Sequence, residues 1–481
     1  MKLQQRDRQI LSIALPSIVS NITVPLLGLV DVAIMGHVGN AVYIGAIAVG
    51  SMIFNLVYWI FGFLRMGTSG MTSQALGRRD LPEVTLLLAR SLAVAFGVAL
   101  VLLLLRGPLL TVMLALIKPT PDVAPLAARY FHICVWGAPA MLGLYGLIGW
   151  FIGMQNTRAP MFISIMQNVV NIAASLTLVV WGGLKLEGVA AGTVIAQYAG
   201  FIVALCLLAR HYGRLRRHFR LGAVPDRRAM GRFFTVNRDI FLRTLCLVAV
   251  NLYFTSAGAR QGAVVLAVNT LLLQLYLLFS YVMDGFAYAG EAVCGRYYGA
   301  RNRAAFSDTL RRLFVWGGAM VVLFTAVYAI GGTPFLRLLT SDGDVIAASA
   351  AYFPWAVAIP AAGVAAFVWD GVFVGITATR AMLVSLAVAA ASFFGVYMAF
   401  HSAMGNHALW LAMIVYLFMR GLTQTAVYAF FKRWLRLDFC AGAGLGCRLG
   451  SRSRRIILPD VASATAPGAV AANMAVFDGV G

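Results

Sequence analysis

Apolar segments long enough to cross a bilayer recur from one end of the chain to the other. A transmembrane helix needs about 20 predominantly apolar residues, and in this chain 61% of the 481 residues are hydrophobic and only 11% are charged. Transmembrane β-strands would alternate apolar and polar residues, whereas these segments are apolar all round. The pattern predicts an all-α polytopic membrane protein with twelve transmembrane helices, at residues 10–35, 44–74, 84–105, 130–153, 160–184, 188–209, 240–258, 263–295, 310–331, 350–375, 381–402 and 407–431.

Positive charge lies in alternate loops of this predicted topology. Ten arginines and only two acids fall between residues 210 and 243, and the intervening loops are short and nearly uncharged. An excess of Lys and Arg in alternate loops is typical of the cytoplasmic side of a membrane protein. The net charge of +21 therefore indicates orientation in a lipid bilayer and argues against nucleic-acid binding. We expect a multi-pass protein of the bacterial inner membrane with both termini cytoplasmic.

The two halves of the chain carry a repeat. Residues 149–159 match residues 371–381, and residues 77–80 match residues 299–302, in both cases 222 positions apart. Six predicted helices separate the copies, and since six is even, both halves start on the same side of the membrane, as in transporters with parallel repeats. We predict two parallel six-helix lobes around a central cleft. A duplicated structural bundle without a transport role is the alternative.

This repeat defines the expected domain organisation. The two lobes are predicted at residues 1–209 and 240–438, joined by a basic cytoplasmic linker at residues 210–239. Residues 439–481 are rich in Ala and Gly, and we expect them to form a disordered cytoplasmic tail or to be an unselected extension.

Four acids fall inside predicted helices: Asp31, Asp284, Glu291 and Asp370. A charge at the centre of a bilayer costs about 3 kcal/mol on insertion scales, so such groups usually face a cavity or a partner. For Asp31 and Asp370 we favour ion coupling or substrate contact over buried structural polarity. Both interpretations stay open for Asp284, while Glu291 lies near a helix end and suits a structural salt bridge.

Arg65 is the clearest base inside a predicted helix. The 222-residue offset aligns it with Ala287, which is about one turn from both Asp284 and Glu291. Two lobes related by a two-fold axis would bring these helices face to face. We therefore predict a structural ion pair of Arg65 with Glu291 or Asp284; an arginine whose side chain reaches the membrane interface is the alternative.

Uncharged polar residues follow one face of the fifth predicted helix. Asn168, Asn171 and Ser175 are spaced i, i+3 and i+7, and Thr193 begins the polar set of the next helix. Such a stripe either lines water or bonds to neighbouring helices. Asn21 is a further candidate for an ion or substrate cleft. Pro25 removes a backbone hydrogen bond from the first helix and predicts a hinge there.

Motifs of several other protein classes do not occur in the sequence. There is no GxxxxGK[ST] for ATP-driven pumping, and no HExxH or GxSxG for hydrolysis. The six cysteines show no CxxC spacing, so we expect neither a disulfide framework nor a metal site. We expect no enzyme and no cofactor beyond a coupling ion.

Four stretches resemble the multidrug and toxic compound extrusion (MATE) family. Residues 15–37, LPSIVSNITVPLLGLVDVAIMGH, are similar to its first helix. FGFLRMGTSG at 61–70, MDGFAYAGEA at 283–292 and VWDGVFVG at 368–375 look like its DinF-like branch. The resemblance covers residues 8–438. It implies two six-helix lobes, a central cleft and antiport of protons or sodium against organic, often cationic, compounds.

The same resemblance implies roles for individual residues. Asp31 takes the place of the family's N-lobe proton-binding aspartate, and Asn171 and Thr193 match polar partners described around it. Ser175 stands where related archaeal members have a second aspartate, so this site would hold one carboxylate. Asp370 matches an acid implicated in C-lobe cation binding in other branches.

We therefore expect a monomeric antiporter that exports small organic compounds by alternating access. A proton is favoured over sodium, because one carboxylate can take up a proton whereas sodium needs several oxygens in a compact shell. The alternatives are a flippase for a lipid-linked precursor and, less favoured, a membrane-embedded enzyme. A flippase would line its cleft with cations for phosphate, and the predicted intramembrane acids outnumber the bases.

The charge pattern makes a topology prediction. Single cysteines introduced at Arg78 and Ser307 should react with an impermeant thiol reagent only from the cytoplasmic side, and one at Asn40 only from outside, because the basic loops stay inside. Labelling in right-side-out and everted vesicles measures this. A C-terminus at residue 438 that is labelled from outside would contradict the topology.

Overall fold

The computed structural model describes residues 5–38, 41–339 and 342–441, and for some helical residues in these ranges, among them 24–33 and 431–441, the backbone alone. The predicted tail at 439–481 lies almost wholly outside the described residues. The chain divides into two compact units after Trp434, and the first of these units contains all of the predicted site residues.

Every regular element in the described ranges is helical. The α-helices are α1 (Gln5–Val38), α2 (Ala41–Phe61), α3 (Phe63–Gly77), α4 (Leu81–Leu104), α5 (Arg106–Ile117), α6 (Val123–Cys134), α7 (Ala138–Gly153), α8 (Arg158–Leu176), α9 (Leu186–Tyr212), α10 (Arg227–Ala259), α11 (Ala263–Ala289), α12 (Gly295–Gly299), α13 (Arg303–Leu339), α14 (Gly343–Gly375), α15 (Thr379–Met404) and α16 (Asn406–Ala441). Short 3-10 or π turns are η1 (Val135–Gly137), η2 (Thr177–Trp181), η3 (Gly213–His218), η4 (Leu221–Ala223) and η5 (Gly290–Cys294).

The predicted number of membrane helices is confirmed. Eleven helical stretches among the described residues are long and apolar enough to cross a membrane, from Val42–Gly77 to Asn406–Phe430. The 34-residue helix α1 precedes them and completes the twelve. The second and eighth spans are each built from consecutive helices, α2 with α3 and α11 with η5 and α12, at corresponding places in the two halves.

Several helix boundaries differ from the sequence prediction, and two of the differences have a local cause. The seventh span begins at Arg227, inside the stretch predicted as a linker, because the Asp226 carboxylate accepts a hydrogen bond from the Arg228 backbone N–H at 2.9 Å and caps the helix there. The predicted fourth span is interrupted by η1, and Pro139 lies in the first turn of α7. Proline has no backbone N–H to donate to the preceding turn, and here the turn directly before α7 is 3-10.

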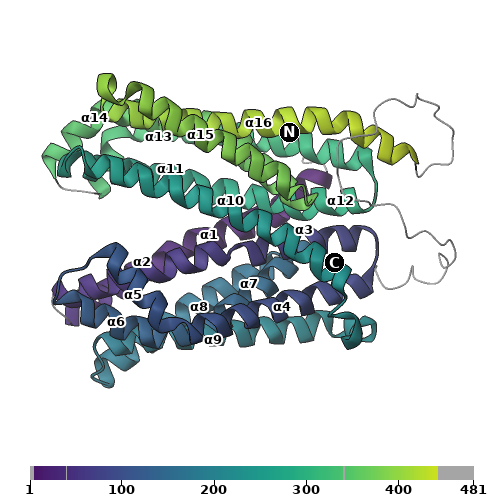
Figure 1. Cartoon of the computed structure of the whole chain (residues 1–481), viewed down its shortest axis with the longest axis horizontal. Helices are drawn as coiled ribbons and strands as arrows, with labels where there is room; N and C mark the ends of the chain where they lie inside the picture. The colour runs from purple at the N-terminus through teal and green to yellow at the C-terminus, as the bar shows by residue number, and fades with distance from the viewer. Residues whose placement is uncertain (1–4, 39–40, 340–341, 442–481) are drawn as a thin grey trace. The chain divides into compact units, whose positions relative to one another are not determined.

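The helices form two lobes joined along a seam. Figure 1 shows α4, α7, α8 and α9 on one side and α13, α14, α15 and α16 on the other. In the first lobe α8 packs on α9 and α2 on α6, and in the second α11 packs on α14 and α10 on α15. Several helices contact both lobes: α1 packs on α8 and α11, α3 packs on α7 and α12, and α10 packs on α15 and α3.

The seam is held by close backbone contacts that repeat across it. A Cβ added to Gly77 would overlap the carbonyl oxygen of Arg296, and one added to Gly299 would overlap the carbonyl oxygen of Gln74. Gly77 corresponds to Gly299, and Gln74 to Arg296, at the 222-residue offset. Each repeat therefore packs its glycine on the equivalent residue of the other, as a two-fold axis requires.

Hydrogen bonds across the seam follow the same symmetry. Gln74 Nε2 donates to Thr377 Oγ1 at 3.1 Å and to the Gly375 carbonyl at 2.9 Å. In the opposite direction Arg296 donates to Gln155 Oε1 at 2.8 Å. Gln155 and Thr377 are also equivalent positions. The end of α3 is thus bonded to the loop after α14, and α12 to the loop after α7.

These contacts predict that Gly299 cannot carry a side chain without loss of stability. Gly299→Ala should lower the free energy of unfolding by about 1–3 kcal/mol, because the added methyl group forces the backbone of α3 to move. Thermal unfolding of the detergent-purified protein measures the change. The matched control is Gly318→Ala, whose Cβ would lie in open space; equal melting temperatures for the two variants would contradict the packing described.

Candidate functional site

Asp370 on α14 is enclosed by two arginines. Its Oδ2 accepts hydrogen bonds from Arg243 of α10 and Arg420 of α16, and its Oδ1 accepts one from Gln424 Nε2 at 2.8 Å. None of these four residues is more than 7% exposed. One carboxylate faces two guanidinium groups, so the cluster carries a net positive charge.

Packing of α16 against α14 positions this cluster. Arg420 and Gln424 are four residues apart and therefore project from one face of α16. The Arg420 guanidinium also lies 5.7 Å from the ring centre of Phe367, one turn before Asp370. Trp369 Nε1 donates to Thr425 Oγ1 at 2.7 Å and ties the same two helices together. Removing Asp370 would leave two buried arginines without their partner, which is costly.

The expectation that intramembrane acids outnumber bases was wrong. Arg90, Arg243 and Arg420 are buried inside spans. With Arg65 there are therefore four such bases, as many as the four acids predicted inside helices. Arg243 closes a run of ten arginines and resembles the last residue of a basic loop. The i, i+4 pair of Arg420 and Gln424 was the available signal, since polar residues at that spacing share a helix face.

The second charged contact crosses the seam. Arg65 Nη1 of α3 lies 3.5 Å from Glu291 Oε2 on the π turn η5, with the glutamate side chain 2% exposed. The Arg65 guanidinium also lies 4.3 Å from the ring centre of Tyr288. The structure thus brings together the pair predicted from the repeat. A π turn inside a longer helix is frequent at functional sites.

Asp284 lies between these two contacts. It is half-buried on α11, and its carboxylate is in electrostatic range of Arg65 on one side and of Asp370, Arg243 and Arg420 on the other. Among the described residues no side chain forms a hydrogen bond or ion pair with it. Asp284 therefore joins the two contacts into one buried charge network and is its most accessible acid.

The polar stripe on α8 contacts α9. Asn171 and Ser175 are fully buried, and Asn171 Nδ2 donates to Thr193 Oγ1 at 3.1 Å. Asn171 Oδ1 and Ser175 Oγ have no hydrogen-bond partner among the described residues. The side chains of Asp31 and Pro25 lie outside the described part of α1, so their roles stay predictions.

The two other predicted cleft asparagines bind backbone. Asn168 Nδ2 donates to the Thr23 carbonyl at 2.9 Å, and Asn21 Nδ2 donates to the Tyr281 carbonyl at 3.1 Å. These bonds tie α1 to α8 and to α11, respectively. In the described ranges no group of three or more His, Cys, Asp or Glu residues has a metal-binding arrangement.

Comparison with known proteins identifies the family to which a chain of this architecture belongs. The MatE family model matches residues 16–177 and 240–400, one match in each half. The chain belongs to the MatE family. It is 37% identical to the DNA damage-inducible protein F of Escherichia coli strain K12 over 427 residues, which covers 89% of this chain and 93% of the relative.

More distant similarities are found to a plant protein in sequence and to a solved transporter in fold. The chain is 26% identical over 383 residues to the chloroplastic protein DETOXIFICATION 44 of Arabidopsis thaliana, covering 77% of this chain and 72% of the relative. The Vibrio cholerae MATE transporter VcmN in the bent form superposes with a TM-score of 0.79 at 18% identity, over 89% of this chain and 98% of that one.

The buried contact of Arg65 with Glu291 predicts a stability defect. Arg65→Ala should lower the free energy of unfolding by about 3–5 kcal/mol, because Glu291 would stay buried without a compensating charge. Adding Glu291→Gln should recover part of that loss. Thermal unfolding and the yield of monodisperse protein in detergent measure both effects.

A matched pair is available as the control. Arg129 and Glu187 lie 3.6 Å apart with side chains 69% and 39% exposed, so Arg129→Ala should change stability by only about 0–1 kcal/mol. An Arg65→Ala protein that melts with the parent, or a double variant no more stable than the single one, would show that the buried pair contributes nothing.

Proposed function

We propose that this MatE protein is a secondary antiporter that exports organic compounds, cationic ones in particular, in exchange for protons. The observation that supports this substrate class is the balanced charge network, which lies within the second lobe and reaches Arg65 of the first across the seam. Arg243 and Arg420 are engaged by Asp370, and Arg65 by Glu291. Of the three acids in this network, Asp284 is the one without a bonded cation among the described residues, so its carboxylate is available to a cationic substrate.

The proposed coupling residue is Asp31, which resembles the family's proton-binding aspartate. Ser175, where related members have an acid, is fully buried beside the α8–α9 contact. The N-lobe site then holds a single carboxylate, and uptake of one proton discharges it. A sodium site would need several oxygens in a compact shell, and Ser175 adds no charged oxygen to such a shell. Asn171 and Thr193 would orient the polar surroundings, and Pro25 would let α1 bend.

Asp370 is proposed to couple through its ion pairs. A cation would have to displace two guanidinium groups to reach this carboxylate, because both donate to the same oxygen. Protonation of Asp370 would leave Arg243 and Arg420 repelling one another in a low-dielectric site. The contact between α10 and α16 would then loosen, which gives a route from proton uptake to helix movement.

Alternating access follows if ion and substrate favour different states of the lobes. A ligand shifts a conformational equilibrium only by its difference in affinity for the two states. The seam between α3, α12 and the loops after α7 and α14 is closed in this structure, on the face that carries the basic loops. We propose that this face is cytoplasmic, with both termini on that side of a bacterial inner membrane.

The alternative function is a flippase for a lipid-linked precursor. Recognition of a phosphate headgroup would call for arginines that face the cleft without a carboxylate partner. All three arginines of the described network are paired instead, which supports cationic cargo. Everted vesicles tested with organic cations and with a lipid-linked anion would separate the two functions.

Asp31→Asn should abolish efflux driven by a pH gradient while leaving membrane insertion intact, because the amide cannot exchange a proton. Transport of a fluorescent organic cation in everted vesicles, under imposed proton or sodium gradients, measures this. The control Asp344→Asn changes an exposed acid in the first turn of α14 and should transport normally. Full efflux by Asp31→Asn, or efflux in the parent driven by sodium alone at fixed pH, would refute the assignment.

A further inference from the structure

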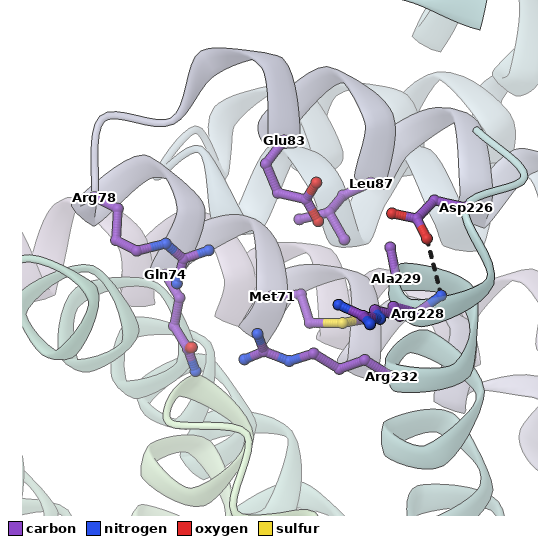
Figure 2. A pocket seen from close by; sticks show the side chains of 9 residues that line it. All are labelled: Met71, Gln74, Arg78, Glu83, Leu87, Asp226, Arg228, Ala229 and Arg232. Atoms are coloured by element: carbon purple, nitrogen blue, oxygen red, sulfur yellow. Dashed lines mark hydrogen bonds between the residues drawn. The ribbon is translucent and has the colours of Figure 1, made fainter. Parts of the chain in front are cut away.

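A basic pocket lies where α3 ends, α4 begins and α10 begins, on the face with the arginine-rich loops. Its volume is about 290 Å³, and three of its lining residues are arginines, Arg78, Arg228 and Arg232. In Figure 2 the guanidinium group of Arg232 points toward the side of the pocket where Arg78 and Gln74 lie. The proposed transport mechanism uses none of these arginines.

The two acids that line the pocket are already engaged. Glu83 Oε1 accepts a hydrogen bond at 2.9 Å from Arg90, which also donates to the Val224 carbonyl at 3.2 Å. Asp226 accepts the bond that caps α10, from the Arg228 backbone N–H. Among the described residues, no carboxylate forms an ion pair with the guanidinium groups of Arg78, Arg228 and Arg232. The pocket therefore holds more positive charge than its own acids compensate.

The arginines also repel one another. Partial burial, and then the neighbouring charge of Arg232, lower the pKa of Arg78. Like charges held together around one cavity are unfavourable unless an anion enters it. Arginine binds phosphate through two parallel N–H bonds, which makes it the preferred side chain for this anion. Helix N-termini such as that of α10 add backbone dipoles of the same sign.

We propose that this pocket binds a phosphate group, carried either by the headgroup of an anionic phospholipid or by a soluble phosphate. Arg78 and Arg232 supply the paired donors, and Arg228 adds a third positive charge. Basic pockets between helices at the cytoplasmic side of membrane proteins are suited to anionic headgroups. Met71 and Leu87 in the lining give an apolar surface beside the arginines.

Binding here would act on the seam between the lobes. Gln74 lines the pocket and also donates hydrogen bonds to the Gly375 carbonyl and to Thr377 Oγ1 of the other lobe. A phosphate held by Arg78 and Arg232 would stabilise the end of α3 in the position that makes these bonds. The inference is independent of the transported substrate, and it predicts that the anion favours the state with this seam closed.

The test compares the parent with Arg78→Gln/Arg232→Gln in the full-length protein. If the ligand is a soluble anion, inorganic phosphate should raise the melting temperature of the parent in detergent. If it is a lipid headgroup, phosphatidylglycerol should stay bound to the parent in native mass spectrometry. It should also raise the melting temperature in nanodiscs above the value in phosphatidylcholine alone. The double variant should bind the active probe roughly tenfold more weakly or worse, because two charge-assisted contacts are lost. The control Arg214→Gln/Arg217→Gln removes two exposed arginines of η3 and should bind as the parent does.

A second variant distinguishes loss of binding from loss of folding. Ala229→Trp fills the pocket but keeps all three arginines, and should also abolish binding. Stabilisation by phosphatidylglycerol alone identifies a lipid headgroup, and stabilisation by inorganic phosphate identifies a soluble anion. If neither probe stabilises the parent, or if the η3 control loses as much binding as the pocket variant, the site does not exist.

Discussion

Charge compensation inside an apolar helix bundle is the constraint on which the arrangement of this protein depends. A lone carboxylate or guanidinium would be expensive in a bilayer, and here every member of the network except Asp284 has a bonded partner of opposite charge. Asp370 faces Arg243 and Arg420, and Glu291 faces Arg65. These contacts join α10, α14 and α16 within one lobe and α3 to η5 across the seam.

Most of the architecture could be predicted from the sequence, because a membrane helix is specified by its length and its apolar composition. Twenty apolar residues in a row predict a span whatever its neighbours are, and two short repeats at one offset were enough to predict parallel lobes and the approach of Arg65 to Glu291. The start of α10 was misplaced because a cap by one side chain, Asp226 on Arg228, decides it. Basic composition gave no hint of that bond.

The site was less predictable, since it depends on which helix faces meet. Arg243 ends a long basic stretch, and nothing in its neighbourhood separates it from a loop arginine until α10 and α14 are seen in contact. Asn168 and Asn21 were expected in a cleft, but they bind the carbonyls of Thr23 and Tyr281. A polar side chain in an apolar helix must find a partner, and sequence alone does not distinguish a neighbouring backbone from a solvated cavity.

The seam has a consequence for how the molecule changes state. Its contacts are backbone atoms packed on glycine and a few hydrogen bonds, with Gln74 and Arg296 at equivalent places. Contacts of this kind lose about a quarter to a half of their attraction when the partners separate by about 0.5–1 Å. Because the two-fold relation duplicates them, both copies break in the same displacement. In the proposed alternating access, opening of this face would therefore be abrupt rather than graded, with the energetic barrier concentrated at the first small movement of one lobe against the other.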